Sequence, residues 1–312
     1  MTALTAAGPR RVLIVFNPTA GTRNGRRLSR VVQDLEEAGC TVSVETTKAA
    51  GEATSIARRA ASSGAFDVVA AAGGDGTVNE VAGGLAGGVR DVSLAIIPLG
   101  TANVLAYEIG IGRDLRRAAR TIAIGHSRPL HLGRVNGAPF ALMVGAGFDG
   151  DVVASVTPKL KRRLGKLAYV VRGLGEWWRG GGARCRVTID GASRDALWVV
   201  VSNARSYGGQ FLLAATADIG TAEFAVTVFA AGSRLDLLRY LGALAGGRVG
   251  RCRGVTVYHG TRIELRGEAA LQADGDARGR LPASVIASDE FVPLLVDPRQ
   301  CVTGSADASR RP

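Results

Sequence analysis

The sequence predicts an α/β domain built on a parallel sheet, followed by a β-sandwich domain. In the N-terminal part, apolar strand-like runs alternate four times with amphipathic helical patterns. After Gly125, strand-like runs separated by glycine turns dominate instead. With 312 residues, of which 46% are hydrophobic and 21% charged, the chain is long enough for two domains with separate cores.

The elements of the first domain follow one another as strand, loop and helix. Because such alternation favours right-handed crossovers, we expect a parallel sheet whose polar loops gather at the carboxyl ends of its strands. One helical face, for example, carries Leu28, Val31 and Leu35 and ends at Gly39. We expect strands at residues 11–16, 41–44, 66–72 and 92–97, with helices at 26–38, at 52–62, from 78 on, after 103 and at 114–124.

The second domain is expected to consist mainly of strands. Two helical segments, 159–178 and 234–244, interrupt them. The strand-like runs are 130–135, 140–144, 186–189, 197–202, 224–229, 255–258, 262–265 and 292–296. We therefore divide the chain into an α/β nucleotide-binding domain at 1–125, a β-sandwich domain at 126–302 and a disordered polar tail at 303–312.

The chain is basic, with a formal net charge of +12 and a pI of about 10.4. This excess favours an anionic partner, which means nucleic acid, a membrane surface or an anionic substrate. A GC-rich genome, which favours arginine, alanine and glycine, explains it equally well. Neither a signal peptide nor a run of about 20 apolar residues is apparent, so we expect a protein that is soluble or peripheral to a membrane.

The four cysteines lie far apart and form no Cys-x-x-Cys pair. This spacing indicates neither a zinc site nor a framework of disulfides, and a reducing cytosol is the simplest compartment for the chain.

A glycine-rich turn, Gly73-Gly74-Asp75-Gly76-Thr77, separates an apolar strand from a helical pattern. Glycines let backbone N–H groups face an anion, and the helix that follows adds the positive end of its dipole. The turn therefore predicts a phosphate site, in which Asp75 either holds Mg²⁺ or organises the loop. The alternative is a plain strand-to-helix turn.

Two carboxylates stand close together near the end of the chain, in Gln272-Ala273-Asp274-Gly275-Asp276. In strand geometry both would point the same way. A kinase needs one carboxylate to orient or deprotonate the acceptor hydroxyl, and a second helps to hold magnesium. A solvated Asp-Gly hairpin turn is an equally good interpretation of the sequence.

The segment 145–150 fits the dinucleotide pattern Gly-x-Gly-x-x-Gly, but we interpret it as a structural turn. Nothing around it forms a βαβ unit, and the region about twenty residues further on is basic where a ribose-binding acid is needed.

A basic cluster with nearby aromatic residues suits an anionic membrane interface better than a merely solvated helix face. Its members are Lys159, Lys161, Arg162, Arg163, Lys166, Tyr169, Trp177 and Trp178.

Six motifs, in this order along nearly the whole chain, resemble those of the bacterial diacylglycerol kinase and sphingosine kinase-like lipid kinases. NAD kinases and phosphofructokinases share a related Gly-Gly-Asp-Gly turn, and the resemblance implies their Rossmann-like sheet in the first domain. The motifs are residues 17–21, 47–53, 73–80, 98–103, 147–149 and 274–276.

The resemblance implies transfer of the γ-phosphate of ATP, with Mg²⁺, to a lipid hydroxyl. It makes Asp75 the organiser of the phosphate loop and metal, and makes Asp274 or Asp276 the general base. The metal ligands themselves stay open. The nucleotide contacts that it implies are Asn17, Pro18, Thr19, Ala20, Gly21, Thr47, Gly73, Gly74, Asp75, Gly76, Thr77, Val78, Asn79 and Thr101.

Three positions depart from the family's pattern. Asp276 is one methylene shorter than the family's glutamate, and Val104 follows Asn103 where many members have aspartate. Thr221 takes the place of an aspartate that helps to bind a structural Mg²⁺, and Asp218 comes three residues too early. We therefore leave that structural metal site open.

The leading hypothesis is an ATP- and Mg²⁺-dependent lipid kinase of phospholipid metabolism, cytoplasmic and peripheral to the inner face of an anionic membrane. A soluble small-molecule kinase of the NAD-kinase type and a non-catalytic, nucleotide-responsive membrane-binding protein are the alternatives. No nucleic acid partner is expected. The sequence leaves open which lipid is the acceptor, because apolar pockets are generic, and whether the chain forms a homodimer.

Overall fold

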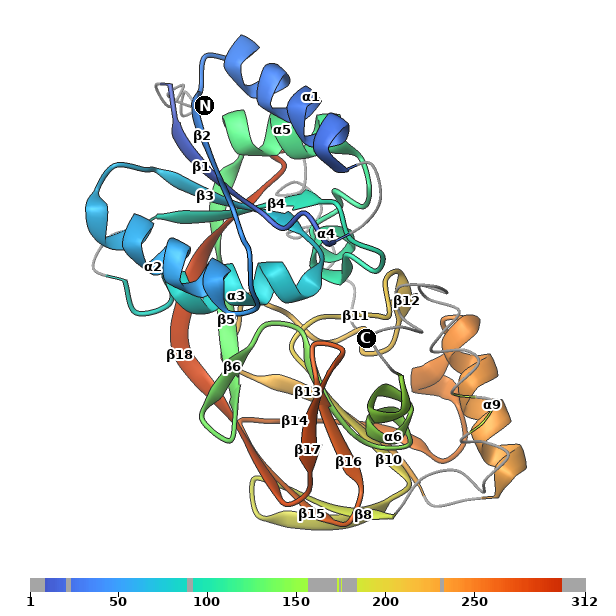
Figure 1. Ribbon diagram of the computed structural model, residues 1–312. Coiled ribbons are helices and arrows are strands. Elements are labelled where there is room, and N and C mark those ends of the chain that lie inside the picture. Colours follow the sequence, from blue (N-terminus) through green and yellow to red (C-terminus); the bar gives the residue numbers. More distant parts are fainter. Residues whose placement is uncertain are drawn as a thin grey trace, which may run out of the picture. The chain divides into compact units, whose positions relative to one another are not determined.

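The computed structural model describes residues 9–20, 24–88, 92–156, 173, 175, 184–230 and 233–298, which form two compact units (Figure 1). Unit 1 takes in the described residues up to Leu130 and those from Glu290 on, and unit 2 runs from His131 to Asp289. The α/β domain and the β-sandwich expected from the sequence are both confirmed. The basic aromatic cluster and the polar tail lie outside the described residues.

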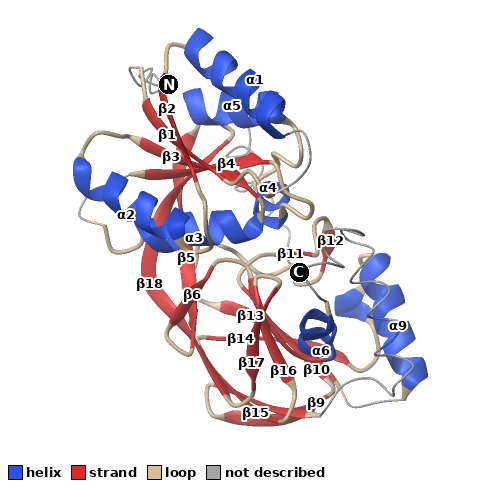
Figure 2. Cartoon of the chain, viewed as in Figure 1, coloured by secondary structure: helices blue, strands red, loops and turns tan. Residues whose placement is uncertain are grey.

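Unit 1 alternates strands and helices, as Figure 2 shows. Its elements are β1 (Arg11–Phe16), α1 (Asn24–Glu37), β2 (Thr41–Thr46), α2 (Glu52–Ser63), β3 (Val68–Gly73), α3 (Asp75–Leu85), β4 (Ser93–Pro98), α4 (Val104–Glu108), α5 (Leu115–Ile124) and the start of β5 (His126–Val135).

The strands of unit 1 lie in the order β2-β1-β3-β4, and each neighbouring pair is parallel. Helices α1 and α5 pack together on one face, and α2 and α3 pack together on the other (Figure 1). The chain moves outward from β1 to β2 and then crosses back to β3. Ligands of open parallel sheets bind beyond the carboxyl ends at such a reversal of strand order, which here lies between β1 and β3.

A strand from the far end of the chain completes this sheet. The sequence assigned residues 292–296 to the second domain, but they form the last part of β18 (Ala283–Val296), which pairs in parallel with β4 at Leu294 and Leu94. Leu295 is buried in the core of unit 1 with Ile97 and Ile122. An isolated apolar run does not reveal which sheet it joins.

Unit 2 contains short strands and two described helices of eight residues or more. Its elements are β6 (Ala138–Phe140), β7 (Met143–Gly147), α6 (Phe148–Ser155), β8 (Cys185–Ile189), β9 (Ala192–Ala196), β10 (Trp198–Ser202), β11 (Ser206–Tyr207), β12 (Phe211–Leu212), β13 (Phe224–Phe229), α9 (Arg234–Ala245), the 3₁₀ turn η1 (Val249–Arg251), β14 (Val255–Gly260), β15 (Arg262–Gly267), β16 (Ala270–Ala273), β17 (Asp276–Arg280) and the first half of β18.

Two sheets enclose the core of unit 2. The antiparallel sheet β14-β13-β10-β7-β16-β17 supplies Val199 and Val226 to a buried cluster, and the strands β18, β15 and β8 supply Val285, Ile263 and Val187. Strands with alternating inward apolar residues pack face to face in this way in β-sandwiches. Among the described residues, no helix has the length and apolar character needed to cross a bilayer.

Candidate active site

The loops that follow β1 and β3 are tied together by Asn17. Its backbone N–H donates to the Ala72 carbonyl at 3.0 Å, and its Nδ2 donates to Thr77 Oγ1 at 3.1 Å. Its Oδ1 accepts from both the N–H and the hydroxyl of Thr19, at 3.0 and 2.8 Å. Two motifs that lie 60 residues apart therefore form one polar surface at the reversal of strand order.

The loops that follow β3 and β4 approach backbone to backbone. The N–H groups of Leu99 and Gly100 both donate to the Gly73 carbonyl at 3.0 Å. A Cβ placed on Gly100 would lie 2.4 Å from the Gly74 Cα, a distance that side-chain carbons do not adopt. A Cβ on Gly73 would lie 2.4 Å from Thr77 Oγ1. Gly100 is therefore needed for the close packing of the two loops, and Gly73 for the packing of Thr77 against its own turn.

Helix α3 begins directly at the glycine-rich turn. Its N-cap is Gly74, which has no side chain to bond the first N–H groups, and Gly76 in the first turn is exposed. The first N–H groups of a helix lack partners within it and point along its axis with a partial positive charge. Helix ends of this kind bind phosphate well, and the phosphate site expected at this turn stays a prediction.

The carboxylate of Asp75 links the loop after β3 to the loop after β4. Its carboxylate accepts from the Leu105 N–H at 3.4 Å, and the N–H groups of Asn103 and Val104 also face it. It therefore caps the start of α4 from the neighbouring loop. Burial raises the pKa of Asp75 although these N–H groups oppose the shift. Of the two roles that the sequence left open, the geometry favours loop organisation over metal binding.

Two buried amide oxygens near this surface have no protein partner. They are Asn79 Oδ1 and Asn103 Oδ1, and Asn103 sits in the left-handed region at φ 52°. A buried acceptor without a donor is costly, so these atoms suit a bound molecule that carries hydroxyl or amino groups or metal-bound water. A nucleoside triphosphate with its magnesium provides all three. The residues present therefore fit the group that the sequence predicts.

The remaining predicted nucleotide contacts differ in accessibility. Thr47 is buried, and both its N–H and its hydroxyl donate to the Phe16 carbonyl, at 2.9 and 3.4 Å. The side chain of Val78 is buried and packs in the interior, so only its backbone is available to a ligand. Pro18, Thr19 and Thr101 are exposed, Ala20 is half-buried, and Gly21 lies outside the described residues.

In unit 2, Asp274 lies in a tight turn between β16 and β17. Asp274 and Gly275 have φ of 51° and 82°, as the two central residues of a type I′ hairpin turn do. The expectation that Asp274 and Asp276 point the same way, as residues of one strand, is wrong, because the turn separates them. The Asp-Gly hairpin that we named as the alternative is present.

The carboxylate of Asp274 is not merely solvated, however. Its Oδ2 accepts from the Ala141 N–H at 2.8 Å, and its Oδ1 accepts from the N–H groups of Leu142 and Met143 at 2.9 and 3.0 Å. The Asp274 N–H in turn donates to the Met143 carbonyl at 3.0 Å. Charge-assisted bonds of this kind fix a carboxylate firmly. Asp276, at the start of β17, is exposed.

A buried carboxylate, Asp149, lies behind this turn and was not among the predicted site residues. It accepts from the Tyr207 hydroxyl and, at 2.7 Å, from Gln272 Nε2. Gln272 Oε1 accepts from the Gly275 N–H at 2.9 Å, so the chain of bonds reaches the turn itself. Burial raises the pKa of Asp149. Its motif, 147–149, contributed to the family resemblance, which was the available signal.

The glycine pattern at 145–150 serves packing. A Cβ on Gly145 would lie 1.8 Å from Asp149 Oδ2, and one on Gly150 would lie 1.9 Å from the Ala270 carbonyl oxygen. Strand β7 pairs antiparallel with both its neighbours, β10 and β16. This excludes the βαβ unit of a dinucleotide site, as the sequence predicted.

No group of three or more His, Cys, Asp and Glu side chains gathers as a metal site in the part of the chain that the structure describes. Where the resemblance implies a structural Mg²⁺, Asp218 Oδ1 accepts from the Gly220 N–H at 2.9 Å, and Thr221 Oγ1 donates to the Asp218 carbonyl at 3.0 Å. These contacts form a turn that uses Asp218 locally.

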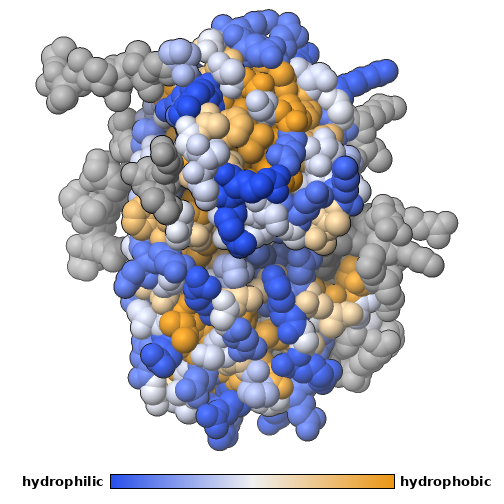
Figure 3. Space-filling model, turned by 60° about the vertical axis from the view of Figure 1, so that its left-hand side comes forward, coloured by the Kyte–Doolittle hydropathy of each residue, from blue (hydrophilic) through white to orange (hydrophobic). Residues whose placement is uncertain are grey.

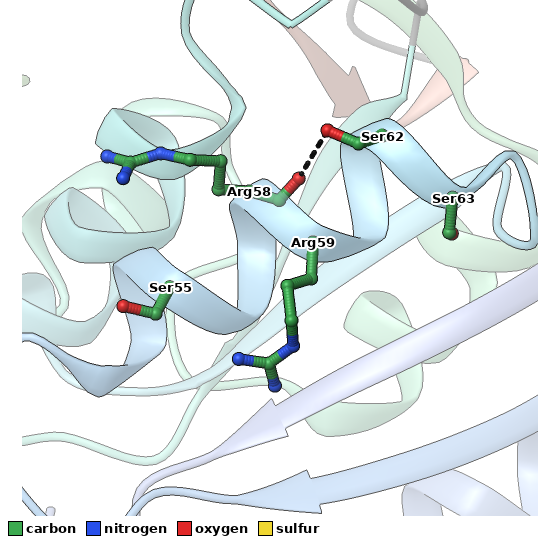
Figure 4. A pocket seen from close by; sticks show the side chains of 5 residues that line it. All are labelled: Ser55, Arg58, Arg59, Ser62 and Ser63. Carbon is green, nitrogen blue, oxygen red and sulfur yellow. Dashed lines mark hydrogen bonds between the residues drawn. The ribbon is translucent and has the colours of Figure 1, made fainter.

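A hollow of about 540 Å³ runs along α2 and is unrelated to these loops (Figure 4). Its lining residues occupy one helix, mostly in its second half, which in a parallel α/β fold lies away from the carboxyl ends of the strands. Arg59 there pairs with Glu45 at 2.6 Å. The lining residues are Ser55, Arg58, Arg59, Ser62 and Ser63.

Known proteins and family models match most of this chain. The family model described as diacylglycerol kinase catalytic domain matches residues 11–135, and that described as YegS C-terminal NAD kinase beta sandwich-like domain matches residues 142–297. A diacylglycerol kinase of Bacillus subtilis (strain 168) is 32% identical over 283 residues, covering 89% of this chain and 93% of the relative. One of Staphylococcus aureus (strain MRSA252) is 29% identical over 291 residues, covering 92% of each.

Solved structures share the fold. A crystal structure of a protein from Bacillus anthracis str. Sterne superposes with a TM-score of 0.79 at 22% identity, covering 96% of this chain and 99% of that one. A crystal structure of a diacylglycerol kinase from the same organism gives 0.69 at 20% identity, covering 93% and 98%. At these identities the likeness concerns the fold alone.

Proposed function

The chain belongs to the diacylglycerol kinase family of lipid kinases, and from this premise we propose that it transfers the γ-phosphate of ATP to a hydroxyl group of a lipid such as diacylglycerol or a sphingoid base. The observation that carries the proposal is the Gly73-Gly74 turn at the reversal of strand order, with a helix N-terminus directly behind it. That combination is a phosphate site in many unrelated sheets.

In the proposed function, residues 1–125 form the nucleotide-binding domain. The N–H groups at the start of α3 bind the phosphates, and Asn79 and Asn103 supply acceptors for the nucleotide's hydroxyl or amino groups or for metal-bound water. Asp75 keeps the loops after β3 and β4 together around that surface. Magnesium bound with ATP neutralises charge on the phosphates during transfer.

Residues 126–302 form the proposed lipid-substrate domain, from which 290–296 complete the sheet of unit 1. In the proposed function, Asp274 binds and orients the acceptor hydroxyl, because three backbone N–H groups hold its carboxylate in one orientation. A carboxylate held in this way suits phosphoryl transfer, where orientation of the hydroxyl counts for more than a strong base. Asp276 adds a second negative charge beside the turn, which helps to hold a magnesium ion.

A lipid acceptor places the working enzyme at a membrane surface, so we propose a cytoplasmic protein that binds the inner face of the membrane peripherally. The net charge of +12 supports this location, because anionic lipids attract a basic protein.

The experiment that tests the proposal is transfer of ³²P from [γ-³²P]ATP, with Mg²⁺, to a total lipid extract resolved by chromatography. An Asp274→Asn, Asp276→Asn double variant is run beside the wild type. We expect a labelled lipid that disappears in the double variant, and its mobility identifies the acceptor class. Labelling of a water-soluble acceptor in place of any lipid, or ATP binding with no transfer at all, would contradict the proposal.

A further inference from the structure

Helix α9 turns an apolar face to the solvent. Leu235 and Leu238 are 74% and 41% exposed, although Leu237 and Tyr240 on the opposite side are buried as expected for an amphipathic helix. The outward face of a surface helix normally carries polar residues. Gly242, one turn further along this face, is also exposed, so no polar side chain covers it there.

The neighbouring strand β12 extends this apolar area. Phe211 and Leu212, which form β12, are 41% and 40% exposed, and β12 contacts α9. We call Phe211, Leu212, Leu235 and Leu238 the α9 patch. Hydrophobic residues also reach the surface elsewhere, for example in the upper part of the face seen in Figure 3. In the α9 patch, four large apolar side chains come from two elements that touch.

The helix α9 and the segment that follows it carry arginines with little opposing charge. Between residues 230 and 258 the chain carries five arginines and one acidic residue, Asp236. Asp236 is already engaged, because its carboxylate accepts from the Ser233 N–H at 2.8 Å and pairs with Arg239 at 3.0 Å. Arg239 is exposed on α9, and Arg248, Arg251 and Arg253 are exposed in and beside η1, which packs against the helix.

We propose that the α9 patch docks this enzyme onto a bilayer that contains anionic lipids. The four apolar side chains enter the boundary between headgroups and acyl chains, and the exposed arginines bind lipid phosphates. Leucine and phenylalanine beside arginine is the composition of helices that lie in a membrane interface. The inference rests on the proposed function, because a lipid acceptor has to be taken from such a surface.

The charge argues against a second copy of the chain as the occupant. A two-fold interface places the same patch on both subunits. It would bring two sets of arginines together with only Asp236 to offset each set, and like charges repel. An anionic bilayer instead supplies the opposite charge over its whole surface.

The test is flotation of the full-length protein with vesicles of phosphatidylcholine and phosphatidylglycerol at about 7:3, beside vesicles of phosphatidylcholine alone. The patch variant is Leu235→Ser, Leu238→Ser. The matched control is Val44→Ser, Ile124→Ser, which removes two apolar side chains that are 47% and 56% exposed in unit 1. All four side chains are surface-exposed, so each variant should melt as the wild type does.

We expect the patch variant to bind anionic vesicles at least about tenfold more weakly than the wild type, with the control variant within about twofold. An Arg248→Gln, Arg251→Gln variant should lose most of the preference for phosphatidylglycerol and the sensitivity to salt. Equal flotation of the patch variant and the wild type would overturn the proposal. So would a wild-type dimer that the patch variant converts to monomer in sedimentation equilibrium.

Phosphorylation of a short-chain, water-soluble diacylglycerol, measured in the same samples, separates this inference from the proposed function. If the wild type floats but phosphorylates no diacylglycerol, docking stands and the proposed acceptor fails. If the wild type phosphorylates the soluble acceptor but the patch variant works as well on vesicles as the wild type, docking fails and the kinase stands.

Discussion

The carboxylate of Asp274 accepts a hydrogen bond from the backbone N–H of Leu142 at 2.9 Å, across 132 residues of sequence. The bond fastens the β16–β17 turn to the segment that leads into β7. Asp276, two residues further on, lies beyond the turn and is exposed. The two carboxylates therefore differ in environment, and replacing each one separately distinguishes structural from catalytic effects.

Asp274→Asn should lower both stability and turnover. An amide places a donor opposite a backbone N–H, so we expect a loss of about 3 kcal/mol in the free energy of unfolding and of at least about 10²-fold in kcat. Asp276→Asn is the matched variant. It should melt as the wild type does and lose less turnover. Thermal unfolding and initial rates on one lipid acceptor measure both, and a larger loss of turnover in Asp276→Asn would assign the hydroxyl to Asp276.

The contact between Gly74 and Gly100 supplies a second pair of variants. Gly100→Ala forces apart two backbones that a Cβ would approach to 2.4 Å, so it should cost about 1–3 kcal/mol of stability and weaken ATP binding. Gly74→Ala meets only an ordinary contact of 3.5 Å and should melt normally. If the phosphates of ATP lie against this turn, the added methyl group of Gly74→Ala nevertheless weakens ATP binding. Titration calorimetry measures the ATP affinity of both variants. An unchanged affinity in Gly74→Ala would show that the phosphates bind elsewhere.

Asp75→Ala removes the carboxylate that caps α4. Loss of such a cap costs about 1 kcal/mol, so the fold should survive, whereas kcat should fall at least about 10²-fold because the two loops are no longer held in register. Asp75→Asn keeps one acceptor oxygen and should retain more activity than the alanine variant. Circular dichroism and steady-state rates measure both. Wild-type turnover in Asp75→Ala would remove this residue from the site.

Asp149 should make the stability of the wild type depend on pH. Burial raises the pKa of Asp149, so the folded state favours the protonated acid. Its contribution to stability is present at low pH and is lost as the pH rises through the raised pKa. In Asp149→Asn the amide can donate to Tyr207 and accept from Gln272 without a charge. We expect the Tm of the variant, relative to the wild type, to rise with pH.

Burial also raises the pKa of Asp75, which therefore adds its own pH dependence to the stability. Asp75 is present in both the wild type and Asp149→Asn, so its effect cancels in the difference between their Tm values. A difference in Tm that stays constant from pH 4 to pH 9 would contradict the prediction.

The sequence predicted the layout of unit 1 well for a physical reason. Its strands and helices are made of neighbouring residues, and the rule that crossovers are right-handed brings the loops after β1 and β3 together. That the two loops lie close together was therefore expected, whereas the hydrogen bond between Asn17 and Thr77 was not.

What the sequence missed depends on partners far away in the chain. Asp274 is fixed by residues 141–143, and Asp149 is buried against Tyr207 and Gln272. The sequence of a glycine-rich segment does not show whether water or backbone N–H groups surround its carboxylate. The destination of residues 292–296 was missed for a similar reason, because β18 pairs with β15 at its start and with β4 at its end.

The pairing of β18 with β4 has a consequence for folding during synthesis. A ribosome releases β4 long before it releases residues 290–296, so during synthesis one edge of β4, a strand almost wholly buried in the finished protein, waits without its neighbour. Unpaired strand edges of this kind recruit other chains. The N-terminal sheet can therefore close only after residues 290–296 have emerged, and until then the nascent protein lacks the strand that covers this edge against aggregation.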